Sequence, residues 1–192
     1  MPPRSPIQAS ASTVAVFGSS RSPEQSAPYA QARQLGAALA AAGFAIASGG
    51  YGGLMEAVSR GAAEAGGKVI GVAAASLSRK TNRWVQQEIV VETWDQRLFR
   101  LLELGDGYVA CPGETGTLVE LAVAWEMMSK GLLPRKPLVA LGNYWLPVIE
   151  LIQRAMPQAP AEGGSRDLVR VVESVPEAVS LLRQELLQAP EP

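Results

Sequence analysis

The feature that most constrains this chain is the alternation of short apolar runs with longer stretches of helical spacing, which extends over nearly its whole length. Runs such as TVAVFG (13–18) and KVIGVAA (68–74) have the length and composition of strands buried on both faces. Stretches such as PYAQARQLGAALAAAG (28–43) have helical spacing and end in glycine. Strands that alternate with helices predict a parallel sheet covered on both sides. We therefore expect an α/β fold, a Rossmann-like doubly wound parallel sheet with helices on both faces.

The expected strands are 13–18, 44–50, 68–74, 88–92, 107–111, 136–142 and 168–173. The expected helices are 28–43, 53–67, 94–105, 117–131, 145–155 and a last one that begins at the capping pair Ser174 and Glu177. A loop is expected at 157–167. With 192 residues, of which 47 % are hydrophobic, we expect one nucleotide-binding domain over residues 1–192. The Pro- and Ala-rich ends, 1–11 and 187–192, are expected to be disordered tails.

Composition excludes several classes of chemistry. The chain has no histidine, so Ser-His-Asp and Cys-His catalysis and imidazole acid–base chemistry are excluded. The one cysteine, Cys111, excludes an internal disulfide and a thiolate zinc site, and it is interpreted as a small buried hydrophobe. We expect no metal and no cofactor. Catalysis is left to carboxylates, Arg, Lys, Tyr, Ser and Thr.

The charge balance bears on partners and location. A formal net charge of -1 with mixed signs provides no field for a nucleic-acid backbone or an anionic membrane. No apolar run is long enough to cross a bilayer, and the N-terminus lacks the apolar core of a signal peptide. We expect a cytoplasmic protein without nucleic-acid or membrane partners.

Doubly wound sheets bind ligands beyond the carboxyl ends of their strands, so the strand-to-helix loops are where a site is expected. In the serine loop FGSSRS (17–22), Gly18 permits close backbone approach, and Ser19, Ser20 and Arg21 are candidates to hold a phosphate, although a Gly-Ser turn is also ordinary loop chemistry. The glycine loop SGGYGGLMEA (48–57) precedes a helix. Its bare amides and the helix dipole favour an anion site, and a tight turn with positive φ angles is the alternative. Met55 stands where the third glycine of the dinucleotide fingerprint falls, which weakens the case for NAD.

The threonine loop CPGETGT (111–117) leads into a third helix. Two interpretations of Glu120 in this region stay open. Thr117 and Glu120 have the spacing of a capping box, in which the carboxylate bonds to the start of the helix. Alternatively, Glu120 belongs to a pocket that holds an anion.

Three other features carry weaker predictions. The basic segment SLSRKTNR (76–83) is either a plain surface loop or a loop that closes over an anionic ligand. The four tryptophans are expected in the core or an interface rather than as stacking platforms for bases. Of Arg97 and Arg100, one turn apart, one is expected to be solvated.

Two motifs resemble a known family. SGGYGGLMEAVSRGA resembles the GGGxxGLM-type segment, and PGETGTLVE the PGGxGTxxE segment, of the LOG family of cytokinin-activating phosphoribohydrolases. The resemblance covers residues 13–155. Members of that family carry an arginine fifteen residues before the proline of the second motif, and Arg97 stands fifteen residues before Pro112.

The resemblance implies hydrolysis of the N-glycosidic bond of a nucleoside 5′-monophosphate, typically an N6-substituted AMP, to free base and ribose 5-phosphate. It implies that Arg97 and Glu120 are the catalytic pair, without a cofactor or metal, and that the protein is a homodimer. The residues that it assigns to the phosphate and sugar are Gly18, Ser19, Ser20, Gly49, Gly50, Gly52, Gly53, Met55, Gly113, Thr115, Gly116 and Thr117.

One residue departs from the family pattern. Glu114 replaces the second glycine of PGGxGT, and a carboxylate there repels a phosphate unless it points away or pairs with a cation. The family also has relatives that resemble molybdenum-cofactor carriers. The alternative function is therefore a non-catalytic binding or carrier protein for a phosphorylated ligand, such as molybdenum cofactor or a nucleotide. A regulatory protein with a vestigial site is a third possibility.

Overall fold

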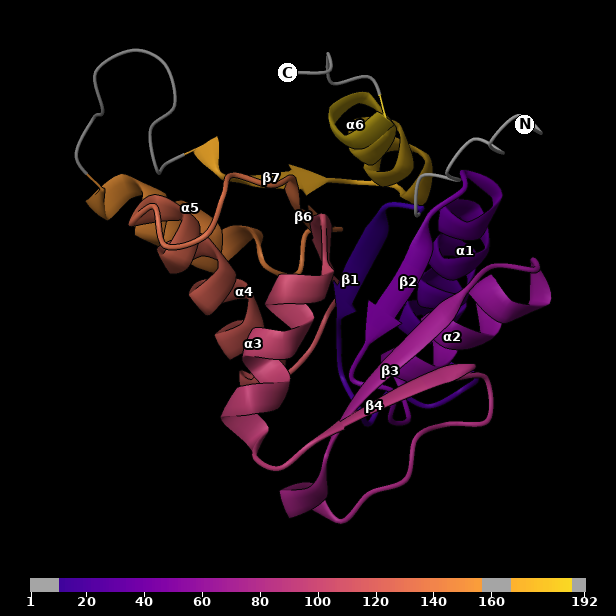
Figure 1. The fold of residues 1–192 in the computed structure, drawn as a ribbon. Coiled ribbons are helices and arrows are strands. Elements are labelled where there is room, and N and C mark those ends of the chain that lie inside the picture. The colour runs from indigo at the N-terminus through magenta and orange to yellow at the C-terminus, as the bar shows by residue number, and fades with distance from the viewer. Residues whose placement is uncertain (1–10, 157–166, 188–192) are drawn as a thin grey trace, which may run out of the picture.

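Seven parallel strands form one sheet in the order β4-β3-β2-β1-β5-β6-β7 (Figure 1). The computed structural model describes residues 11–156 and 167–187. The strands are β1 (Thr13–Phe17), β2 (Ala45–Ser48), β3 (Val69–Ala74), β4 (Gln87–Val91), β5 (Gly107–Ala110), β6 (Leu138–Leu141) and β7 (Val169–Val172). The helices are α1 (Ala27–Ala41), α2 (Leu54–Glu64), the short 3-10 helix η1 (Ala75–Leu77), α3 (Trp94–Leu104), α4 (Thr115–Ser129), α5 (Leu146–Ala155) and α6 (Val175–Leu187).

The sheet lies between two layers of helices, with α1, α2 and α6 on one face and α3, α4 and α5 on the other (Figure 1). Side chains along β1 alternate between these layers. Val14 and Val16 pack with α1 and α2, while Ala15 and Phe17 pack with α3 and α4. A strand buried on both faces must be apolar at every position, which explains the continuous run that predicted it. The predicted α/β doubly wound fold is confirmed.

Most predicted elements lie where expected. The Ser26 hydroxyl accepts a hydrogen bond from the backbone N–H of Tyr29 at 3.3 Å and so caps α1, which ends shortly before Gly43 at a φ of 90°. The predicted cap of α6 is confirmed, because the Ser174 hydroxyl accepts from the N–H of Glu177 at 3.4 Å.

Most boundaries differ from the prediction by a few residues, and two of the differences affect predicted features. Helix α4 begins at Thr115, with Glu114 at the N-cap position, so Thr117 and Glu120 do not form a capping box. Leu187 is the last residue of α6 rather than the start of a tail. The predicted tails at 1–10 and 188–192, and the predicted loop at 157–166, lie outside the described residues.

Helix α4 also bears on the predicted homodimer. Trp125 and Met128 on this helix are compatible with an interface or with the core, and both are buried in the core between α4 and the sheet. Burial within the chain accounts for these residues, and the homodimer stays a prediction.

The strand order places a crevice at one point of the sheet edge. The chain lays down β1 to β4 in one direction, and α3 then carries it back to β5 on the other side of β1. The loops that follow β1 and β5 therefore leave toward opposite faces of the sheet, which opens the crevice where such folds bind ligands.

Candidate functional site

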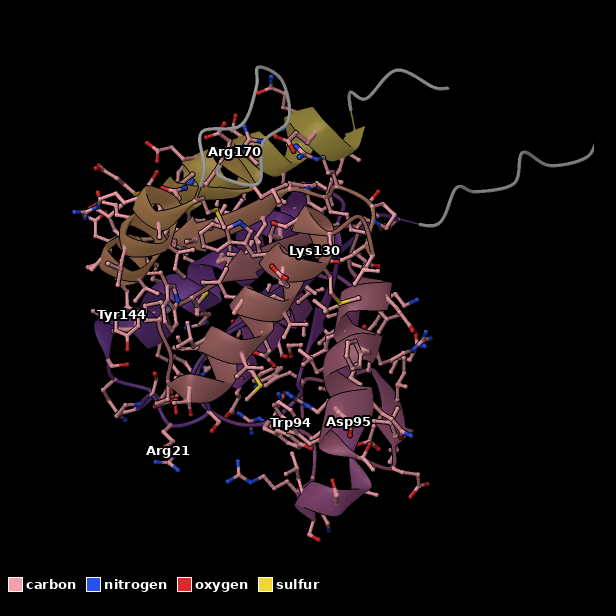
Figure 2. The ribbon with its side chains drawn as sticks, turned by 90° about the vertical axis from the view of Figure 1, so that its left-hand side faces the viewer. Arg21, Trp94, Asp95, Lys130, Tyr144 and Arg170 are labelled. Carbon is pink, nitrogen blue, oxygen red and sulfur yellow. The ribbon has the colours of Figure 1, made fainter. Side chains whose placement is uncertain are left out.

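A cavity of about 530 Å³ opens at the carboxyl ends of the strands. Its lining comes from the serine, glycine and threonine loops, from the 76–83 segment and from α3 and α4. The lining residues are Gly18, Ser20, Arg21, Tyr51, Met55, Ser76, Leu77, Arg79, Trp94, Arg97, Glu114, Thr115, Gly116, Thr117 and Glu120. Figure 2 shows Arg21 and Trp94, from distant parts of the chain, at the same end of the molecule.

Arg97 and Glu120 form a buried ion pair in the wall of this cavity. Arg97 Nη1 lies 3.4 Å from Glu120 Oε1, and the two residues are only 6 % and 8 % exposed. Arg97 comes from α3 and Glu120 from α4, which pack on the same face of the sheet. By contrast, Arg100 forms an exposed ion pair with Glu103, so the prediction that one of these two arginines is solvated is confirmed.

Several contacts fix the guanidinium of Arg97. Its Nε donates to the carbonyl oxygen of Val72 at 3.0 Å, and its Nη2 lies 3.7 Å from the sulfur of Met55. Its carbon lies 5.2 Å from the ring centre of Tyr51, in a cation–π contact. Gly49 provides the room, because a Cβ atom there would lie 1.5 Å from Nη2. These contacts hold the guanidinium with Nη1 beside Glu120.

Burial raises the pKa of Glu120 from its ordinary 4.5 to about 7, and the charge and hydrogen bond of Arg97 partly offset this effect. The carboxyl group therefore exchanges its proton near neutral pH, which is the property required of a general acid or base. Burial also raises the pKa of the Cys111 thiol to about 12, in keeping with its interpretation as a small buried hydrophobe.

The serine loop lies between the other two loops. The N–H of Ser19 donates to the Pro112 carbonyl at 3.1 Å, and the Ser19 carbonyl accepts from the N–H of Leu54 at 2.7 Å. A Cβ atom at Gly53 would lie 2.4 Å from the Ser19 carbonyl oxygen, so the glycine permits this approach. The three loops predicted to form a site are thus joined through Ser19.

Not every predicted residue lines the cavity. Those that do are Gly18, Ser20, Met55, Arg97, Thr115, Gly116, Thr117 and Glu120. Those outside its lining are Ser19, Gly49, Gly50, Gly52, Gly53 and Gly113.

The glycine loop was predicted to leave its backbone N–H groups free, but two of them have partners within the chain. The N–H of Gly50 donates to the Ser48 hydroxyl at 3.1 Å, and that of Leu54 is taken by Ser19. Gly50 and Gly53 have φ angles of 69° and 63°. The positive-φ alternative therefore accounts for these two glycines, and close packing accounts for Gly49.

The threonine loop is held from the side of α5. The Tyr144 hydroxyl donates to the Gly113 carbonyl at 2.8 Å, and Trp145 Nε1 donates to the Cys111 carbonyl at 2.9 Å. Glu114, the residue that departs from the family pattern, lines the cavity. Its Oε1 accepts a hydrogen bond from the Ser19 hydroxyl at 2.9 Å.

The prediction missed five lining residues, Tyr51, Ser76, Leu77, Arg79 and Trp94. The basic composition of 76–83 had pointed to its loop without identifying a residue. Trp94 is 40 % exposed and so does not belong to the core, which leaves its place in an interface as a prediction, whereas Trp125 and Trp145 are buried as predicted. Its polar neighbours Thr93 and Asp95 were the available signal that this tryptophan begins a helix at the surface.

Comparison with known proteins assigns the chain to a family. Residues 11–151 match the family described as the SLOG cluster4 family. The chain belongs to the SLOG cluster4 family. The matched range contains both motifs, and the predicted LOG-like resemblance is confirmed.

Three individual proteins are similar to this SLOG cluster4 chain in sequence or in fold. The cytokinin riboside 5′-monophosphate phosphoribohydrolase of Rhodococcoides fascians is 28 % identical over 170 residues, which span 84 % of each protein. The solved molybdenum cofactor binding protein of Rippkaea orientalis has a TM-score of 0.74 at 24 % identity, over 91 % of this chain and 96 % of that one. The molybdenum cofactor carrier protein of Chlamydomonas reinhardtii has a TM-score of 0.73 at 23 % identity, over 91 % and 97 %. At these identities the two structures show a shared fold.

Residues 11–156 and 167–187 contain neither a metal-binding cluster nor a helix that could span a membrane. No group of three or more Cys, Asp or Glu side chains in these ranges is placed to hold a metal ion. No helix within them has the length and apolar character needed to span a bilayer.

Proposed function

We propose that the protein hydrolyses the N-glycosidic bond of a purine nucleoside 5′-monophosphate, typically an N6-substituted AMP, to free base and ribose 5-phosphate. The observation that carries this proposal is the buried Glu120–Arg97 pair in the wall of a cavity of about 530 Å³. A phosphoribohydrolase 28 % identical to the chain over 84 % of its length supports the same reaction class.

The chemistry suits these two side chains. The bond from the sugar C1′ to the base nitrogen breaks with its electron pair leaving on the base, so positive charge builds up on the sugar ring. An ionised Glu120 stabilises that charge and accepts a proton from the water that attacks C1′. The base gains a proton as it leaves, so the hydrogen and hydroxyl of one water are divided between the two products.

Arg97 acts on Glu120 rather than on the water. Its guanidinium is fixed by Val72 and Met55 and lies 3.4 Å from the carboxylate, which it orients and keeps partly ionised. Because the pKa of Glu120 is about 7, the carboxyl group both takes and returns a proton near neutral pH.

The test is a product assay on AMP and N6-substituted AMP. Glu120→Gln keeps the size of the side chain and removes its ability to take a proton, so base release is expected to fall at least about a hundredfold. The control is Glu126→Gln, which removes a carboxylate from the same helix whose side chain is 62 % exposed. Unchanged base release in the Glu120 variant would refute the catalytic assignment.

The alternative is a binding or carrier protein for a phosphorylated ligand, such as molybdenum cofactor. The observation that favours it is the similarity of the fold to the molybdenum cofactor carrier protein of Chlamydomonas reinhardtii, with a TM-score of 0.73. A carrier binds a phosphorylated pterin or nucleotide tightly and releases no base. The product assay together with a binding titration of the wild type therefore separates the two functions.

A further inference from the structure

Some charged side chains of the cavity are paired with each other and others are not. Five charged side chains line it: Arg21, Arg79, Arg97, Glu114 and Glu120. Arg97 and Glu120 pair with each other in the buried wall. This leaves the carboxylate of Glu114 at the start of α4 and two arginines on separate loops, one after β1 and one after η1.

The carboxylate of Glu114 is held at the N-terminal end of α4. Glu114 is the N-cap residue, and the Ser19 hydroxyl that donates to it at 2.9 Å also accepts from the N–H of Arg21 at 3.0 Å. A negative charge is stable at this end of a helix, where the free N–H groups and the helix dipole attract anions. The chain's own carboxylate therefore lies beside the place where a bound phosphate would use the same attraction.

A phosphate at the first turn of α4 would meet this fixed charge. At about 6 Å in a water-exposed site, repulsion between a carboxylate and a phosphate dianion weakens binding about fivefold to tenfold. A sugar hydroxyl, which donates a hydrogen bond, is a better partner for the carboxylate.

Arg21 and Arg79 provide the compensating positive charge. In the described part of the chain, no carboxylate lies within ion-pair distance of either guanidinium. Both residues are exposed, and the Arg79 guanidinium lies 5.9 Å from the ring centre of Tyr51. Guanidinium groups bind phosphate oxygens through paired N–H donors.

We propose that Glu114 determines how the ligand is oriented: it keeps the phosphate away from the first turn of α4 and directs it to Arg21 and Arg79. This inference rests on the proposed function for the identity of the ligand, a nucleoside monophosphate. In this orientation the sugar hydroxyls face Glu114 and the C1′ side of the sugar faces Glu120.

The test measures binding of AMP and of adenosine, which differ only in the phosphate, by titration calorimetry in the Glu120→Gln background. Glu114→Gln is expected to strengthen AMP binding about fivefold and to leave adenosine binding no tighter. The double variant Arg21→Gln, Arg79→Gln is expected to weaken AMP binding at least about tenfold and to leave adenosine binding unchanged. The control Glu103→Gln removes an exposed carboxylate that does not line the cavity, and it is expected to change neither.

Each result decides one question. Equal AMP affinity with and without the Glu114 carboxylate, or with and without the two arginines, overturns the inference, as does a failure of every variant to bind AMP. Base release by the wild type decides the proposed function separately. The expected affinity changes without base release by the wild type would support the role of Glu114 and reject the hydrolase. Base release without those affinity changes would support the hydrolase and reject the role of Glu114.

Discussion

At the scale of single residues, the position of Arg97 depends on what Gly49 lacks. The glycine loop was predicted for the freedom of its backbone, yet Gly49 is needed for space, since a Cβ atom would lie 1.5 Å from the guanidinium. A Cβ atom added at Gly52 in the same loop would have only one close neighbour, the Ser20 carbonyl oxygen at 3.6 Å. Two glycines of one motif therefore have different physical roles.

We predict that Gly49→Ala lowers base release about a hundredfold, because a misplacement of about 1 Å in a catalytic group has an effect of that size. Gly52→Ala is the matched control and is expected to retain nearly full activity. The measurement is the rate of base release by both variants, with thermal denaturation as a check of folding. Equal rates in the two variants would contradict the role assigned to Gly49.

Glu120 also predicts how stability depends on pH. Its pKa is about 7 in the folded protein and near 4.5 in the unfolded chain. The stabilisation from its protonated form is therefore complete below about pH 4.5 and is lost as pH rises through 7, with a total on the order of 3 kcal/mol. Between pH 5 and 8 the wild type should lose more thermal stability than Glu120→Gln. Parallel melting curves for the two proteins across this range would contradict the shifted pKa.

At the scale of elements, α1 and α2 approach with their backbones nearly in contact. A Cβ atom at Gly36 would lie 2.1 Å from the Val58 carbonyl oxygen, and one at Gly61 would lie 1.9 Å from that of Arg33. Both glycines are inside helices, where propensity disfavours them by about 1 kcal/mol relative to alanine. Close packing of the two helices offsets this loss.

We predict that Gly36→Ala destabilises the protein by about 2–4 kcal/mol, because the added methyl group forces the two helices apart. Gly116→Ala is the control, since a Cβ atom there meets nothing within 4 Å and the substitution favours the helix. The free energies of unfolding, measured in urea, should therefore change in opposite directions.

At the scale of the whole molecule, all seven strands are paired in one sheet and both helical layers pack against it. We propose that the chain is a single domain and predict one cooperative thermal transition, with equal calorimetric and van't Hoff enthalpies. Two resolved transitions in a calorimetric scan would contradict this prediction.

Much of the fold could be predicted from the sequence because the signals that determine it are local. Apolar runs, helical spacing and terminal glycines act within a few residues, so the elements and the parallel sheet followed from them. The start of α4 was placed too late because a cap depends on backbone geometry, which Glu114 and Thr117 both permit in sequence. The candidate site was predicted through its two motifs, and Tyr51 and Trp94 were missed because no local signal marks a cavity wall.

By itself, the sequence determined the kind and order of the elements, the family and the chemistry that the absence of histidine leaves available. Only the tertiary structure decided that Arg97 and Glu120 share one buried pair, that Gly49 makes room for it and that Glu114 bonds to Ser19 across the crevice. The physical reason is distance along the chain. These contacts join residues from different elements, and the strand order and side-chain packing that bring them together are properties of the whole fold.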